Sequence, residues 1–77
     1  MFRIHVDFNE MTPDRTRVQI NKHLYARKLE ELGAGTRVIL FTPNDIEVEG
    51  VLEVEKDANS DWWYGVIDWA TLRDLDP

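Results

Sequence analysis

Residues 62–69 (WWYGVIDW) contain all three tryptophans of the 77-residue chain. Buried aromatic side chains each remove about 150–250 Å² of surface from water, so this segment should dominate the core of so short a chain. As a β-strand it would place Trp63, Gly65, Ile67 and Trp69 on one face, and Trp62, Tyr64, Val66 and Asp68 on the other. Neither face is polar, which predicts a central or barrel strand with Trp62 and Tyr64 partly exposed.

The length of the chain predicts a single small domain, residues 1–77, with one core. The sequence contains no cysteine, which excludes disulfides, Cys-based zinc sites and thiol nucleophiles. No apolar run approaches the roughly 20 residues that span a bilayer, and the first residues alternate instead of forming the apolar block of a signal peptide. We therefore expect a cytoplasmic monomer or homodimer without a membrane segment.

Four further segments have the pattern of strands. Residues 2–8 and 16–21 alternate apolar and polar side chains, and Pro13-Asp14 between them predicts a turn that would make them a hairpin. Residues 36–42 are apolar on both faces, and residues 46–55 alternate apolar side chains with glutamates. The sequence thus predicts five strands, counting the tryptophan segment.

One segment has the pattern of a helix. Asn21 is a good N-cap, Gly33 is a good C-terminal residue, and apolar side chains between them recur at helical spacing, namely Tyr25, Leu29 and Leu32. Residues 70–75 could add one helical turn that covers a barrel end. The predicted fold is mainly β within the α+β class: a small five-stranded SH3-like barrel, or a strongly curved antiparallel sheet, with one short helix at about residues 22–32.

No catalytic or phosphate-binding motif is present in the sequence. Its two histidines, His5 and His23, lie on a strand's polar face and at the helix start, without a nucleophile or ligand cluster beside them in the sequence. We therefore expect a protein that is not an enzyme and binds neither a cofactor nor a metal.

Charge is distributed unevenly along the chain. The formal net charge is −6, with a balance of +2 over residues 1–44 and −8 over residues 45–77. The predicted strand at 46–55 carries a row of glutamates on one face: Glu47, Glu49, Glu53 and Glu55. This row favours a solvated face whose acids pair with bases such as Arg37, and the alternative is a surface that recognises a basic partner.

Basic residues gather instead between residues 15 and 28. They are Arg15, Arg17, Lys22, His23, Arg27 and Lys28. They could contact phosphates of a nucleic acid, although the same residues could also balance the C-terminal acids within the fold.

Residues 16–42 resemble the AbrB-like swapped-hairpin family of bacterial transition-state regulators and antitoxins. The resemblance lies in the order of a short strand (RVQI, 17–20), a short helix ending in KLEELG (28–33), and a second strand opened by AGTRV (34–38). It implies a DNA-binding dimer with exchanged strands. This chain departs from the family at Asn21-Lys22, where a proline usually begins the helix, and in having a strand before the unit.

Two functional hypotheses follow from these patterns. The first is a small non-catalytic module that binds a protein partner, such as a basic one, through an aromatic patch with an acidic rim: Trp62, Tyr64, Glu47, Glu49 and Glu53. The alternative is a DNA-binding or antitoxin-like regulator that uses the basic cluster: Arg15, Arg17, Lys22 and Arg27. The acidic overall charge disfavours the second hypothesis.

Overall fold

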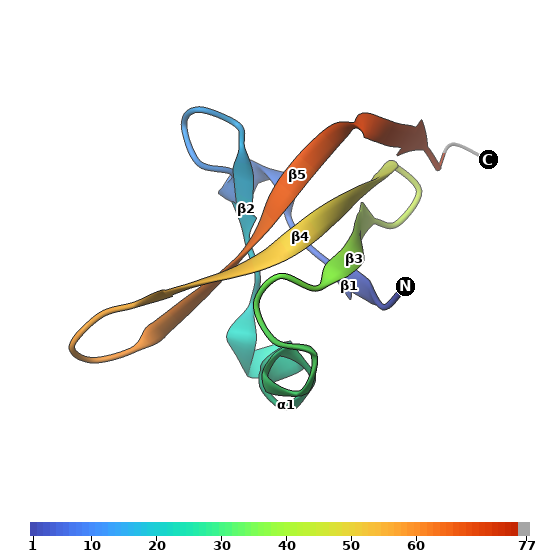
Figure 1. Cartoon of the computed structure of the whole chain (residues 1–77). Helices are drawn as coiled ribbons and strands as arrows, with labels where there is room; N and C mark the ends of the chain where they lie inside the picture. Colours follow the sequence, from blue (N-terminus) through green and yellow to red (C-terminus); the bar gives the residue numbers. More distant parts are fainter. Residues whose placement is uncertain (76–77) are drawn as a thin grey trace.

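The computed structural model describes residues 1–75, whose elements are labelled in Figure 1. In chain order they are β1 (Arg3–His5), the 3-10 turn η1 (Phe8–Glu10), β2 (Arg17–Gln19), α1 (Lys22–Leu32), β3 (Arg37–Thr42), β4 (Ile46–Lys56) and β5 (Asp61–Asp74). The strands form one mixed sheet in the order β1-β3-β4-β5-β2. The prediction of a small α+β domain with five strands and one main helix is therefore confirmed.

Helix α1 begins and ends where the sequence predicts. The Asn21 side chain accepts a hydrogen bond of 2.9 Å from the backbone N–H of the second helical residue, and the Gly33 N–H donates to the Leu29 carbonyl. Leu29 is fully buried, and Tyr25 packs against the same core. The Tyr25 hydroxyl also accepts the backbone N–H of His5 at 2.9 Å, so α1 satisfies a donor on the edge strand β1.

The predicted hairpin between the first two strands is wrong. β1 pairs in parallel with β3, whereas β2 pairs antiparallel with β5 at the opposite edge of the sheet. The first strand is shorter than its alternation suggested because Asp7 caps η1, which turns the chain after residue 6. The turn at Pro13-Asp14 does form and precedes β2. Across this turn, Met11 forms an isolated antiparallel bridge with Val18 of β2.

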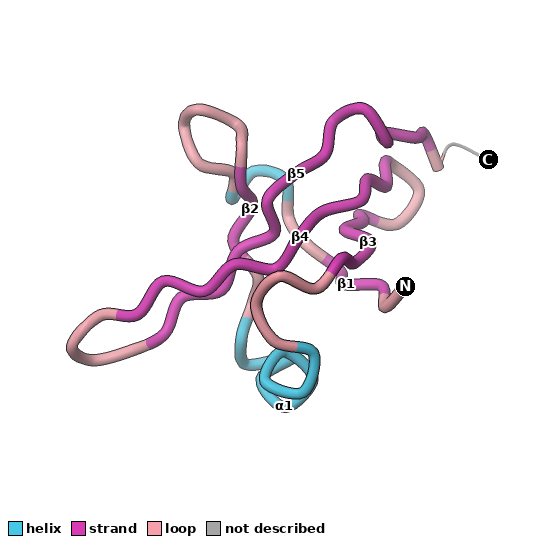
Figure 2. The backbone as a smooth tube through the Cα atoms, in the orientation of Figure 1, coloured by secondary structure: helices cyan, strands magenta, loops and turns pink. Residues whose placement is uncertain are grey.

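The expected closed barrel is not formed by the described strands. β1 and β2 lie at the two ends of the strand order, and no pairing joins them, so the sheet is open. Three of its four strand pairs are antiparallel and one is parallel, which makes it a mixed sheet. Figure 2 shows that the hairpin of β4 and β5 extends well beyond the other strands and ends in a loop.

The tryptophan segment is confirmed as a strand, since β5 spans it and pairs with β4 on one side and with β2 on the other. Its alternation predicts the faces correctly as far as Ile67, which is 8% exposed. Trp69, predicted to point inward, is 40% exposed. The reason is a shift in the register between β4 and β5. Residue 68 of β5 lies opposite Glu49 and residue 73 lies opposite Glu47, so residues 69–72 form a bulge opposite a single residue of β4.

The helical turn predicted at residues 70–75 is also wrong. β5 continues through residue 74, and Leu72 is 44% exposed instead of covering the core. The backbone N–H of Leu75 donates to the Asp45 carbonyl at 2.8 Å, which keeps this end of the chain extended beside β4.

The core lies between α1 and one face of the sheet. Its buried members are Ile4, Val6, Val18, Ile20, Leu29, Val38, Leu40, Val48, Leu52 and Ile67. Leu40 sits at the centre, where it covers two glycines on neighbouring strands. An added Cβ would lie 2.7 Å from Leu40 Cδ1 at Gly50 and 2.6 Å from it at Gly65, so any larger residue at either position would force Leu40 to shift.

Candidate functional site

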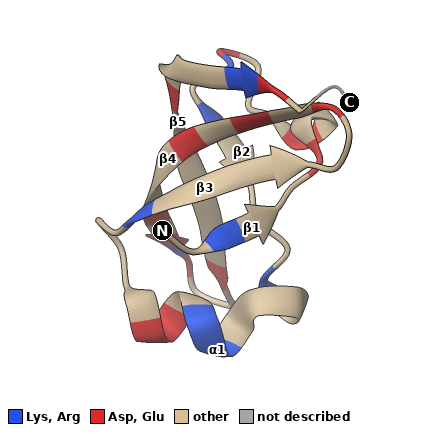
Figure 3. Cartoon of the chain, turned by 90° about the vertical axis from the view of Figure 1, so that its right-hand side faces the viewer, with Lys and Arg blue, Asp and Glu red and all other residues tan. Residues whose placement is uncertain are grey.

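The glutamate row of β4 lies on the sheet face opposite the core, and arginines from the other four strands form ion pairs with it. Figure 3 shows the acidic segments of β4, a basic segment at the start of β3, and a further basic segment on β1, the strand beyond β3. Arg37 binds Glu49 at 2.8 Å and Asp68 at 2.5 Å. Arg17 binds Glu53 at 2.6 Å and also reaches the next glutamate of the row at 2.9 Å. The predicted acidic rim is therefore largely paired within the chain.

Glu47 is the most enclosed member of this row, with 6% of its surface exposed. Its two carboxylate oxygens bind Arg3 of β1, at 3.2 Å, and Arg73 of β5. Burial alone would raise the pKa of the Glu47 carboxyl, but the hydrogen bonds from the two arginines outweigh this effect and lower it below its ordinary value. Glu47 thus joins three strands through one charged group.

The two aromatic residues predicted to bind a partner differ in their surroundings. The guanidinium of Arg17 lies 4.3 Å from the centroid of the Tyr64 ring and covers it. Trp62 is 40% exposed, and its indole N–H donates to Asp57 at 2.9 Å. The ring pairs found within residues 1–75 include neither Trp62 nor Tyr64, so no aromatic cluster forms there. Trp62 is the more accessible of the two.

The structure does not bring the predicted basic cluster together on one surface. Arg17 is bound to glutamates, and the Lys22 ammonium donates to the Ser60 hydroxyl at 3.1 Å and to the Asp61 carbonyl at 3.0 Å. Arg15 lies in the loop before β2, whereas Arg27 lies on α1, and Figure 1 shows these two segments at opposite ends of β2. Two of these four residues are therefore already bound within the chain, and the other two lie on separate segments.

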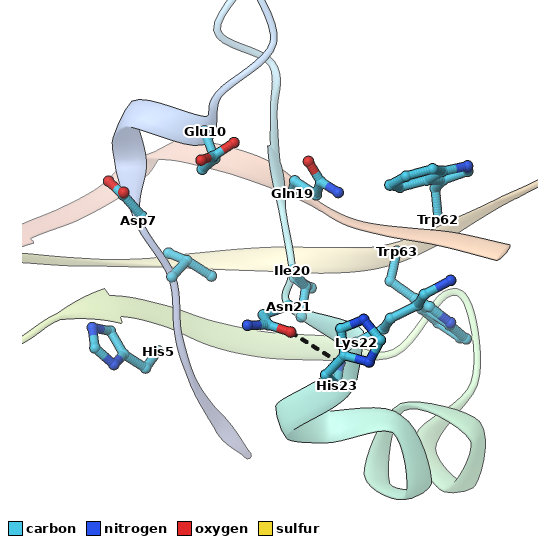
Figure 4. A pocket seen from close by; sticks show the side chains of 11 residues that line it. His5, Asp7, Glu10, Gln19, Ile20, Asn21, Lys22, His23, Trp62 and Trp63 are labelled. Carbon is cyan, nitrogen blue, oxygen red and sulfur yellow. Dashed lines mark hydrogen bonds between the residues drawn. The ribbon is translucent and has the colours of Figure 1, made fainter. Parts of the chain in front are cut away.

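A cleft of about 580 Å³ lies between the segments that follow the two edge strands. One wall comes from the end of β1 and η1, the other from the end of β2, the start of α1 and the start of β5 (Figure 4). Its lining residues are His5, Val6, Asp7, Glu10, Gln19, Ile20, Asn21, Lys22, His23, Trp62 and Trp63. The two walls thus come from segments at the two edge strands of the sheet, β1 and β2, and from the start of β5.

The two ends of the cleft differ in chemistry. Figure 4 shows Asp7 and Glu10 on one side, and Trp62 and Trp63 on the other, with Ile20 between them. Both acids are exposed, and neither forms an ion pair within the described part of the chain. This cleft therefore offers carboxylates, indole rings and apolar surface to one ligand.

Both histidines line this cleft, which sequence analysis did not anticipate. His5 stacks on Phe41 with 5.6 Å between the ring centroids, and His23 lies in the first turn of α1. In residues 1–75, no group of three or more histidine, cysteine or acidic side chains is arranged to hold a metal ion. The cleft residues come from segments far apart in sequence, and no local pattern marks Asp7 or Glu10 as belonging to it.

Comparisons with family models, with curated proteins and with solved structures found no match to this chain. The segment that resembles the AbrB-like family folds as β2, α1 and β3, and its two strands are not paired with each other. No helix within the described residues is long and apolar enough to cross a membrane.

Proposed function

We propose that this protein is a non-catalytic binding module that receives a short segment of a protein partner in the cleft, with Trp62 as the main apolar contact. The observation that carries the proposal is an exposed tryptophan at the end of a cleft with convergent polar groups. Ligand sites are typically concave, with volumes of about 300–1,000 Å³. Tryptophan is among the residues that most often dominate binding energy at protein interfaces.

The cleft is a better candidate than the glutamate row. The row's carboxylates are already bound by arginines, so a basic partner would first have to displace those arginines. Tyr64 is likewise covered by Arg17. The proposed site therefore shares Trp62 with the aromatic patch predicted from the sequence, whereas its other residues are those that line the cleft.

The test compares two tryptophans that are equally exposed. Trp62 and Trp69 are each 40% exposed, and each donates one indole hydrogen bond, Trp69 to the Arg15 carbonyl at 2.8 Å. Only Trp62 lines the cleft. Short random peptides displayed on phage are selected on the wild-type protein, and the enriched peptides are titrated by calorimetry against each variant.

We expect Trp62→Ala to weaken peptide binding by about tenfold or more, the range of a moderate interface hot spot. Trp69→Ala should leave the affinity unchanged, because that indole lies outside the cleft. Circular dichroism is used to check that both variants are folded. Equal losses in the two variants, or a selection that enriches no peptide, would contradict the proposal.

A further inference from the structure

We infer that the partner segment presents a basic side chain, lysine or arginine, to Asp7 and Glu10 in the cleft. This inference rests on the proposed function and specifies the chemistry of the partner. The cleft combines two unpaired carboxylates with indole rings, and a basic side chain has a matching structure: a charged end on a long apolar stem.

The carboxylates of Asp7 and Glu10 have oxygens that no donor of the described chain engages. Asp7 accepts the backbone N–H of Asn9 with one carboxylate oxygen, Oδ1, at 2.9 Å, and no hydrogen bond within residues 1–75 engages its second oxygen. The Glu10 side chain makes no hydrogen bond or ion pair in the same part of the chain. Both carboxylates are exposed, so they attract a cation and repel a phosphate.

Acids on the outer face of the sheet differ from Asp7 and Glu10 in having arginine partners. The acids of the outer face that lie beside an arginine are all bound by one, namely Glu47, Glu49, Glu53, Glu55 and Asp68. The one ammonium that lines the cleft, that of Lys22, is held at the other end by Ser60 and the Asp61 carbonyl. The carboxylates of Asp7 and Glu10 thus remain without an internal cation, as do those of Asp14, Glu30 and Asp45, but Asp7 and Glu10 line the cleft and these others do not.

At the other end of the cleft, Trp62 offers a ring that can contact a cation. Lys22 Nζ lies 5.4 Å from the centroid of the Trp62 ring, so this indole already contacts one ammonium within the chain. Trp63, which is only partly buried, adds apolar surface beside it, whereas Ile20 is 2% exposed. A basic side chain that enters the cleft can therefore lay its methylene groups against the two indole rings while its charge meets the acids.

The test combines changes in the protein with changes in the peptide. The protein variants are Asp7→Asn, which keeps the acceptor for the Asn9 amide, and Glu10→Gln, which keeps the shape of the side chain. The control is Glu30→Gln, which removes the same charge from an exposed residue of α1 that does not line the cleft. In the enriched peptides, each lysine or arginine is replaced in turn by norleucine.

We expect the peptides selected on the wild-type protein to be enriched in lysine and arginine. Replacing the critical basic residue by norleucine should weaken binding to the wild type and to Glu30→Gln by about fivefold, the upper end for an exposed ion pair. The same replacement should have little effect on the double variant Asp7→Asn/Glu10→Gln, because its cleft no longer carries the charge.

Other outcomes separate this inference from the proposed function. Enriched peptides that lack basic residues, or that are acidic, and that still depend on Trp62 would overturn the inference and leave the binding module intact. A norleucine effect of the same size in the wild type and the double variant would also overturn it. Loss of peptide selection altogether would instead remove the proposed function.

Discussion

Replacement of Gly65 by alanine should destabilise the fold through one side chain. The new Cβ would lie 2.6 Å from Leu40 Cδ1 and 2.8 Å from Cδ2, well inside van der Waals contact. Leu40 is completely buried, so any shift of its side chain disturbs the close-packed core around it. Overpacking of this kind costs about 1–3 kcal/mol, and the reduced entropy of the unfolded chain offsets at most about 1 kcal/mol. We expect a net loss of about 1–2 kcal/mol in the free energy of unfolding.

Urea titrations of a double-mutant cycle test this reasoning. Leu40→Ala alone should cost about 2–5 kcal/mol because it leaves a cavity. In Gly65→Ala/Leu40→Ala the alanine methyl occupies part of that cavity, so the combined loss should fall short of the sum by about 1 kcal/mol or more. Gly50→Ala is the comparison, since its Cβ would also lie 2.9 Å from the Val66 carbonyl oxygen. Leu40→Ala should therefore offset a smaller part of the destabilisation caused by Gly50→Ala than of that caused by Gly65→Ala. Strict additivity at Gly65 would refute the argument.

Three further predictions concern stability. Trp63→Ala should cost about 3–5 kcal/mol in urea titrations, because Trp63 packs against the core, whereas Trp62→Ala should cost clearly less; equal losses would contradict the assignment of faces. Asn21→Ala should remove about 1 kcal/mol, since it deletes the N-cap of α1, and an unchanged thermal midpoint would contradict this. Because the pKa of Glu47 is lowered in the folded protein, its charged carboxylate stabilises the fold at pH values above the ordinary pKa of a glutamate, and this contribution is lost as the pH falls through the folded-state pKa. Glu47→Gln should therefore make stability decline less steeply in acid, and identical pH profiles for the two proteins would contradict this.

Local patterns predicted most of the elements. The alternation of Val18 and Ile20 identified β2, and both residues are buried. The N-cap Asn21 and Gly33 marked the two ends of α1 correctly. These features depend on residues only a few positions apart, so they can be recognised without knowledge of the rest of the fold.

Where the local pattern failed, a distant contact was responsible. Trp69 continued the alternation of β5, but the pairing of this strand with β4 shifts register there, and the ring turns outward toward the Arg15 carbonyl. The close packing against Gly50 and Gly65 cannot be recognised from their local sequence, since the side chain that lies over them, Leu40, belongs to another strand.

The sequence by itself determined the class of the fold, the position of the helix and the inward residues of most strands, because hydrophobic periodicity records which side of each element is buried. Only the tertiary structure decided that β1 pairs with β3 and β2 with β5, that arginines neutralise the glutamate row, and that Asp7 and Glu10 share a cleft with Trp62. Strand pairing and cleft formation depend on the burial of surfaces from segments distant in the chain, and such encounters leave no periodic signature in any one segment.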